Sequence, residues 1–364
     1  MDNHDYFDKA LTYGSMRKAL RRCCRNVRWK DSVVGYELHA SQNTHKLIDS
    51  FRDGSYRISP YQRFTVYEPK KREILATRIA DRQFQMSLCQ AGLYDDFVEH
   101  FIYDNCACQI GKGTDFAIKR LKHHMAEYYR DHGSDGWVLA LDIHHFFPST
   151  RHDVAKAAVK KRISDKRAAD YVCGVIDSFG GDNGIGLGSQ ISQLVELAVL
   201  DDLDHYIKER LRVRHYIRYM DDLRLIHHDR EFLRRCWCQI DDKLGEIGFE
   251  LNRKSTMYPL RQGVKFLQWR LCCKSTGKII LRMNGKKVSR ERRRIRKILR
   301  KEVDGEFTQG TAYNSLTAWR ANAARGNEWR RQINMRNYYY TTKAGLRHGE
   351  NHSGGQLPAP QAGA

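Results

Sequence analysis

Three aspartates in this chain could together form a metal site. Asp142 ends the apolar run WVLALD, and Asp221 and Asp222 stand side by side between two further apolar runs. If these segments are neighbouring strands of one antiparallel sheet, Asp142 and Asp221 would face each other a few ångströms apart. Mg²⁺ prefers such oxygen ligands, and two ions held about 3.5–4 Å apart support in-line nucleotidyl transfer. The alternative is that each aspartate is an ordinary turn residue.

The segments around the aspartates predict strands. HYIRYM and LRLIHH form a hairpin with the Asp221-Asp222 pair at its tip, and WVLALDIHHFFPST predicts a buried strand followed by a turn. Upstream, FTVY and REILATR predict another hairpin with a basic turn, followed by a helix from about residue 81. Further helices are expected at 1–59, 150–178 and 230–247, and another after GIGLGSQISQ. A very basic helix is expected from about residue 286.

The charge balance indicates a polyanionic partner. The 364 residues include 64 Lys+Arg against 43 Asp+Glu, a net charge of +21, and the pI is about 9.6. Such an excess is typical of nucleic-acid-binding proteins, with a basic protein lacking any such partner as the alternative. No apolar run is long enough to span a membrane, and the polar, acidic N-terminus is unlike a signal peptide, so a cytoplasmic protein is expected.

The ten cysteines do not predict a zinc site. They occur as adjacent pairs, as CxC pairs and singly, and no CxxC lies at zinc-binding distance from a second CxxC or from a pair of histidines. Reduced cytosolic thiols are therefore expected.

Five segments resemble the motifs of reverse transcriptases, in that family's order, over about residues 60–270. YMDD resembles the central catalytic motif and LDIHHFFPS the first one. GLGSQISQ resembles the template-side turn, YEPKKREILATRIADRQFQ the fingers segment of bacterial and group II intron-type enzymes, and GVKFLQWR the primer-grip hairpin. The Ser189-Gln190 pair in this turn resembles the corresponding motif of reverse transcriptases from diversity-generating retroelements and from unclassified, defence-associated bacterial groups.

The resemblance implies an α+β right-hand polymerase. It would consist of an N-terminal helical extension (1–59), fingers (60–130), a palm of antiparallel sheet and helices (131–275), a basic helical thumb (276–345) and a disordered tail (346–364).

The resemblance also assigns the catalytic centre. Asp142, Asp221 and Asp222 would be the catalytic acids and, with the Ile143 carbonyl, would bind two Mg²⁺ ions, or Mn²⁺ in their place. Asp222 would lie just behind the other two. Phe147 would be the sugar gate, a ring that leaves no room for a 2′-hydroxyl; a core phenylalanine is the alternative.

Other residues would bind the nucleotide, template and primer. Lys71 and Arg72 suit the incoming triphosphate, Arg72 the better of the two, with a solvated basic turn as the alternative. The resemblance also implies nucleotide contacts for Gln193 and for Lys254, which would lie near the leaving pyrophosphate; an exposed loop lysine is the alternative for Lys254. Residues implied for template and primer binding are Gly188, Ser189, Gln190, Tyr219, Phe266, Leu267, Gln268, Arg292, Arg293 and Arg294. Gln268 stands where the family usually has glycine.

The implied function is a Mg²⁺-dependent RNA-directed DNA polymerase that copies a dedicated, structured noncoding RNA in bacterial antiphage defence. The expected partners are this RNA, an RNA–DNA hybrid and dNTPs, with an accessory protein or a homo-oligomer also considered. The alternatives are the error-prone enzyme of a diversity-generating retroelement and a catalytically inactive RNA-binding scaffold. An RNA polymerase would conflict with the aromatic gate. Tyr338-Tyr339-Tyr340 would be either a packed aromatic cluster or a protein primer.

Overall fold

The computed structural model describes residues 5–67 and 71–347, and these divide into two units. The first consists of the chain up to Tyr128 together with Asp135–Pro259, and the second of Tyr129–Ser134 and the chain from Leu260 onward. The predicted subdomain boundaries remain predictions. Of the tail expected at 346–364, the structure describes only residues 346 and 347, which belong to a helix; the remainder, like Lys70 in the basic turn, lies outside the described residues.

A four-stranded antiparallel sheet forms the centre of the first unit. Its strands are β3 (Trp137–Asp142), β4 (His215–Tyr219), β5 (Asp222–His227) and β6 (Thr256–Pro259), in the order β4-β5-β3-β6. Val138, Leu139 and Leu141 of β3 have no exposed surface, which accounts for the continuous apolar run seen in the sequence. The mixture of helices and antiparallel sheets confirms the predicted α+β class.

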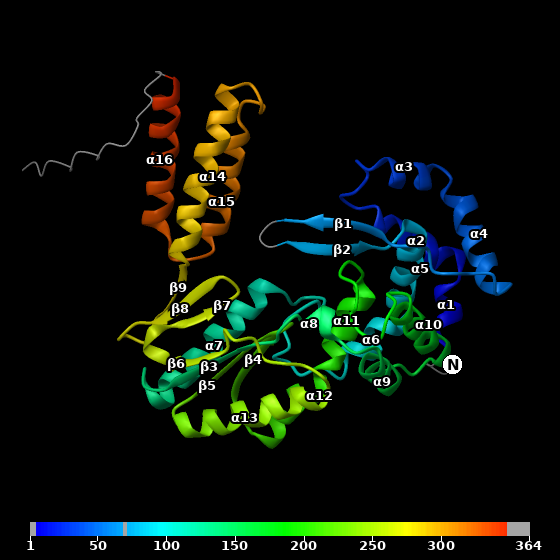
Figure 1. The fold of residues 1–364 in the computed structure, drawn as a ribbon, viewed down its shortest axis with the longest axis horizontal. Coiled ribbons are helices and arrows are strands. Elements are labelled where there is room, and N and C mark those ends of the chain that lie inside the picture. The colour runs from blue at the N-terminus through cyan, green and yellow to red at the C-terminus, as the bar shows by residue number, and fades with distance from the viewer. Residues whose placement is uncertain (1–4, 68–70, 348–364) are drawn as a thin grey trace, which may run out of the picture. The chain divides into compact units, whose positions relative to one another are not determined.

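Helix α13 (Arg230–Glu246) packs against β3 and β5 (Figure 1). It buries Leu233, Cys236, Ile240 and Leu244, whose spacing of three and four residues places them on one helical face. The carboxylate of Asp229 accepts hydrogen bonds from the main-chain N–H groups of Glu231 and Phe232 at the start of the helix, and this cap fixes where the helix begins.

Further helices of the first unit share one hydrophobic core with the sheet. Helix α9 packs against α10 and α11, and α11 continues into α12 and a π-helical turn, η2. The bounds are α8 Phe146–Ser149, α9 His152–Arg162, α10 Lys166–Asp177, α11 Gln190–Val199, α12 Asp201–His205 and η2 Tyr206–Arg210. Helix α7 (Thr114–His132) also lies in the first unit up to Tyr128.

The N-terminal part of the first unit is helical, as predicted, and is followed by an antiparallel hairpin. Helix α2 packs against α4 and α5, where the buried side-chain amide of Gln83 donates hydrogen bonds to the Met16 carbonyl and the Thr44 hydroxyl. The bounds are α1 Tyr6–Ala10, α2 Tyr13–Cys23, α3 Asp31–Leu38, α4 Ala40–Arg52, β1 Gln62–Val66, β2 Arg72–Ala76, α5 Ile79–Leu88, η1 Cys89–Leu93 and α6 Tyr94–Val98.

The second unit contains a three-stranded antiparallel sheet and three helices that pack side by side (Figure 1). Its elements are the 3₁₀ turn η3 (Leu260–Gln262), strands β7 (Val264–Phe266), β8 (Trp269–Cys273) and β9 (Ile279–Met283), and helices α14 (Gly285–Val303), α15 (Thr311–Ala324) and α16 (Trp329–Arg347). Although α14 is very basic, it buries Ile295, Ile298 and Leu299 on one face, so its arginines and lysines occupy the remaining surface.

All ten cysteines are free thiols. Within residues 5–67 and 71–347, no helix combines the length and the apolar character that crossing a bilayer requires.

Candidate active site

The structure brings the three predicted aspartates together at one end of the central sheet. Asp142 is the register partner of Asp222 across β3 and β5, so their side chains lie on the same face. Asp221 lies with Met220 in the two-residue turn between β4 and β5, and its carbonyl accepts a 3.2 Å hydrogen bond from the Ile143 N–H. Asp222 therefore stands directly opposite Asp142, the place that we expected Asp221 to take.

Burial and the neighbouring acids favour the protonated form of Asp222. Burial, together with the nearby carboxylates of Asp142 and Asp221, raises the pKa of Asp222 to about 6, although Arg224 opposes the shift with an ion pair of 2.5 Å. Arg224 follows Asp222 by two residues and thus points to the same face of β5. A group of hard carboxylate oxygens whose mutual repulsion a divalent cation would relieve fits Mg²⁺.

The segment Leu251–Ser255 fixes the main chain of Asp142. The Asn252 N–H donates a 2.7 Å hydrogen bond to the Asp142 carbonyl, and the Asp142 N–H donates one of 3.2 Å to the Ser255 hydroxyl. Lys254, predicted to contact the nucleotide, is exposed on this segment.

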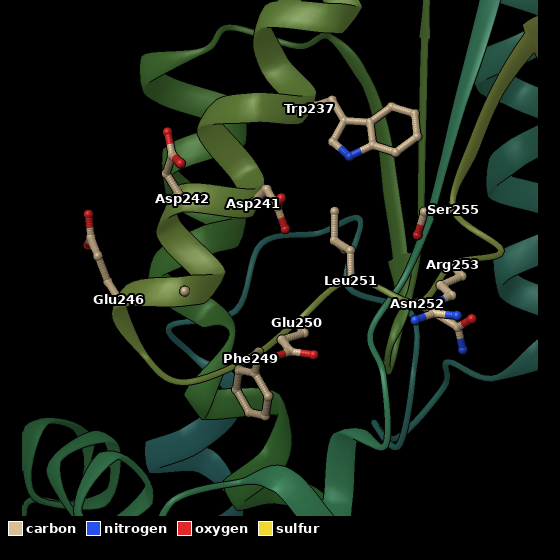
Figure 2. A pocket seen from close by; sticks show the side chains of 11 residues that line it. Trp237, Asp241, Asp242, Glu246, Phe249, Glu250, Leu251, Asn252, Arg253 and Ser255 are labelled. Carbon is tan, nitrogen blue, oxygen red and sulfur yellow. The ribbon is translucent and has the colours of Figure 1, made fainter.

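A pocket of about 690 Å³ lies between this segment and α13 (Figure 2). Trp237 and Asp241 of α13 lie across it from Asn252 and Ser255. It is also lined by the carboxylates of Asp242, Glu246 and Glu250. This concentration of negative charge disfavours a nucleotide or nucleic-acid phosphate.

A fully buried ion pair supports the Met220–Asp221 turn, and we did not predict it. The guanidinium of Arg218 on β4 contacts the carboxylate of Asp204 on α12, with neither side chain exposed. The same guanidinium donates hydrogen bonds of 3.2 Å to the carbonyls of Met220 and Leu197. Arg218 thereby links the Met220–Asp221 turn to the helices beside it. The basic residue directly before YMDD was the available sequence signal.

Glu196 of α11 is a second residue that the sequence prediction missed. Its side chain is completely buried, and its carboxyl oxygens lie 2.8 and 2.9 Å from the hydroxyl of Thr150. Burial raises the pKa of Glu196 well above its usual value, and the nearby charge of Asp221 adds to the effect. An acid within the otherwise apolar stretch LVELAVL was the available signal.

The two adjacent phenylalanines differ in exposure. Phe146 is buried, whereas Phe147 is half-buried, and the Phe147 carbonyl accepts a 2.9 Å hydrogen bond from the Ile185 N–H. His145 before them adopts a left-handed conformation (φ 47°), which turns the chain from the end of β3 into α8. Phe147 therefore keeps part of its ring accessible, as a sugar gate requires.

The predicted template-side turn packs against the β1–β2 hairpin. The Leu75 N–H of β2 donates a 3.0 Å hydrogen bond to the Leu187 carbonyl, and a Cβ added to Gly188 would lie 2.7 Å from the Leu75 carbonyl oxygen. Ser189 caps α11 by accepting a hydrogen bond from the Ser192 N–H. Gln190 is half-buried and Gln193 is exposed.

Lys71 and Arg72, predicted to grip the triphosphate, are both exposed at the beginning of β2. Arg72 is the register partner of Val66, the last residue of β1. Tyr219, predicted to contact the primer or template, is half-buried and is the register partner of Asp222. Lys71, Arg72 and Tyr219 thus each have surface available to a ligand.

The remaining predicted primer contacts lie in the second unit. Leu267 and Gln268 form the turn between β7 and β8 with φ angles of 45° and 76°, a conformation that favours glycine, while Phe266 before them is buried. The last three predicted residues, Arg292, Arg293 and Arg294, are all exposed.

The Tyr338–Tyr340 segment packs within the second unit. Tyr339 is buried and its ring lies 6.0 Å from that of Tyr313. The Arg292 guanidinium lies 5.3 Å from the ring of Tyr338. Tyr340 remains 54% exposed. Tyr339 thus belongs to an aromatic cluster.

No family model and no curated protein matches this sequence. Among solved structures, the chain is similar to a C-terminally truncated apo telomerase from Candida tropicalis, with a TM-score of 0.49, 10% identity, and 68% of this chain and 60% of that chain covered. It is also similar to telomerase from Candida albicans in complex with a telomeric RNA fragment, with a TM-score of 0.48, 8% identity, and 84% and 65% covered. The chain thus spans less than two thirds of either protein.

Proposed function

We propose that this chain is a Mg²⁺-dependent RNA-directed DNA polymerase. The observation that carries the proposal is the meeting of Asp142, Asp221 and Asp222 at one end of β3 and β5. The three carboxylates would hold two Mg²⁺ ions, with the Ile143 carbonyl as a further ligand. When bound, these ions would lower the pKa of a primer 3′-hydroxyl and neutralise charge on the leaving pyrophosphate.

Other residues of the first unit support the proposal through their chemistry. The half-buried ring of Phe147 would exclude a 2′-hydroxyl by steric contact. Arg72 and Lys71 are exposed cations suited to triphosphate oxygens. The backbone at Gly188, which has no room for a side chain, would keep the template-side turn close to the β1–β2 hairpin.

The template would be a dedicated, structured noncoding RNA, and the setting would be bacterial antiphage defence, with cytoplasmic location. The net charge of +21 and the exposed arginines of α14 support an RNA or hybrid partner. The defence setting is supported by the sequence of the GLGSQISQ motif, which differs at several positions from the usual motif of diversity-generating retroelements.

The test is to purify the chain with RNA co-expressed from its own locus, add Mg²⁺ with each labelled dNTP or NTP, and sequence the product. We expect DNA whose sequence identifies the template. A chain carrying both Asp221→Ala and Asp222→Ala should make none, while Asp242→Asn, which changes an exposed aspartate of α13, should remain active.

Two results would count against the proposal. Equal incorporation of ribonucleotides would show that Phe147 is not a sugar gate, and Phe147→Ala would then leave sugar selectivity unchanged. If RNA copurifies but neither dNTPs nor NTPs are incorporated, the inactive RNA-binding scaffold is the better account.

A further inference from the structure

A second group of metal-ligand side chains lies between α7 and the start of β4. One ring nitrogen from each of His124 and His215 and a carboxylate oxygen of Glu127 all lie within 4.8 Å of one another. His124 and Glu127 are three residues apart on α7 and so share a face. His215 is at the end of β4 opposite to the Met220–Asp221 turn. The group is therefore separate from the three aspartates.

The two histidines are buried without full hydrogen bonding. His124 is 2% exposed and His215 is 7% exposed. The Nδ1 atom of each ring is buried and has no hydrogen-bond partner among the described residues. Buried polar atoms are almost always paired, so two such nitrogens beside a carboxylate indicate a site for something that binds them.

Asp104 fixes which nitrogen of His124 is available. Its carboxylate lies 2.9 Å from His124 Nε2 and also binds Arg120 at 2.5 Å and Lys208 at 2.8 Å. This contact occupies Nε2 of the ring, which leaves Nδ1, the nitrogen without a hydrogen-bond partner among the described residues, available to bind an ion. Metal-bound histidines are typically oriented by such a carboxylate.

Within the described part of the chain, the contacts of the Glu127 carboxylate leave room for an ion. Its side chain is 20% exposed, and a guanidinium nitrogen of Arg214 and Nε2 of His123 each lie 3.5 Å from Oε1, beyond the usual length of a charged hydrogen bond. One carboxylate oxygen can therefore bind an ion while the ion pair with Arg214 persists.

We propose that His124, His215 and Glu127 bind one Zn²⁺ ion, with a water molecule as its fourth ligand. Two imidazole nitrogens with one carboxylate oxygen are a common zinc ligand set, whereas Mg²⁺ favours oxygen ligands alone. Because its ligands come from α7 and β4, the ion would fasten the beginning of β4 to that helix. The site is structural and does not depend on the proposed polymerase activity.

The test is the zinc content of the untagged full-length chain, measured by inductively coupled plasma mass spectrometry after growth with zinc and desalting. We expect one zinc ion per chain, and a lower melting temperature after treatment with a chelator, restored by added Zn²⁺. Replacing the zinc with Co²⁺ should give the visible absorption of a tetrahedral ion with nitrogen and oxygen ligands.

Three variants separate the site from adventitious binding. His215→Ala should lose the zinc, and Glu127→Gln, which preserves side-chain shape, should weaken zinc affinity at least roughly tenfold. His100→Ala removes an exposed imidazole elsewhere and should retain the zinc. The proposal is wrong if the wild-type chain carries no more zinc than His215→Ala, or if a folded Glu127→Gln chain binds zinc as tightly as the wild type.

Discussion

The guanidinium of Arg218 and the carboxylate of Asp204 form an ion pair in which neither side chain reaches solvent, with Nε–O distances of 2.8 and 2.9 Å. The hydroxyl of Tyr216 also donates a hydrogen bond to Asp204, at 2.6 Å. Since Arg218 also donates a hydrogen bond to the Met220 carbonyl, the pair couples the Met220–Asp221 turn to α12. Removing one partner of such a buried pair destabilises a protein far more than replacing both partners with apolar residues.

Arg218→Met should lower the free energy of unfolding by about 3–5 kcal/mol, because it leaves the Asp204 carboxylate buried without a counter-charge. Asp204→Leu should have a similar effect for the opposite charge. The chain with both substitutions should recover part of the loss. Urea unfolding of the four proteins gives the coupling energy. A double substitution that destabilises as much as the sum of the two single ones would contradict the account.

Glu196→Gln should leave the free energy of unfolding nearly unchanged at low pH, because a protonated carboxyl and an amide have similar shape. Burial raises the pKa of Glu196 well above 4.5, so the folded state holds a proton that the unfolded state releases. The contribution of Glu196 to stability is therefore complete below pH 4.5 and is lost as pH rises toward the folded pKa. Glutamine does not titrate.

The wild-type chain should consequently lose stability relative to Glu196→Gln as the pH rises above 4.5 toward the folded-state pKa of Glu196, as measured by urea unfolding at each pH. A stability difference that does not change with pH would show that Glu196 is ionised in the folded state.

Metal binding at the aspartates should weaken as pH falls through about 6, because burial and the neighbouring carboxylates raise the pKa of Asp222 to that value and its proton competes with the cation. The same shift lowers stability as pH rises from 3.8 to about 6. Arg224→Gln should move the transition to higher pH, because Arg224 holds the pKa down. The pH at which binding weakens can be measured by titrating Mn²⁺ at a series of pH values and monitoring its binding by electron paramagnetic resonance.

The control for that experiment is Arg234→Gln, which changes an arginine of α13 whose side chain is 61% exposed. It should leave the pH dependence as in the wild type. An unchanged profile for Arg224→Gln would mean that Asp222 does not bind the metal.

Gly188→Ala should destabilise the chain by roughly 1–3 kcal/mol, since the new Cβ would lie 2.7 Å from the Leu75 carbonyl oxygen and φ is +141°. Gly245→Ala in α13, where the Cβ meets nothing within 4 Å, should instead stabilise by about 0.5–1 kcal/mol. Thermal unfolding compares the two. Equal stability of the two variants would contradict the close packing of the 186–188 segment on β2.

Local sequence patterns predicted the strands and helices that carry the site. The apolar run before Asp142 and the two runs that flank Asp221-Asp222 correspond to β3, β4 and β5, and α13 begins and ends within a residue of its expected bounds. Strand register depends on pairing between distant segments, and this is why the sequence did not place Asp222 opposite Asp142.

Contacts between distant residues could not be predicted either. Arg218 looked like an ordinary basic strand residue, because nothing local indicates that Asp204 lies beside it. His124 and Glu127 have a spacing suited to a shared ligand, but the third member, His215, comes from a strand far along the chain. The basic helix α14 was expected. That it buries Ile295, Ile298 and Leu299 depends on how it packs against other helices, and this could not be predicted from the sequence.

The central claim is that the three aspartates catalyse RNA-directed DNA synthesis. The most direct measurement is extension of a labelled DNA primer on a defined RNA template with dNTPs and Mg²⁺, comparing the wild type with Asp142→Asn, Asp221→Asn, Asp222→Asn and the surface control Asp242→Asn. We predict a full-length complementary product for the wild type and Asp242→Asn, and a rate at least about 100-fold lower for Asp142→Asn, Asp221→Asn and Asp222→Asn. Extension at the wild-type rate in these three variants would contradict the account.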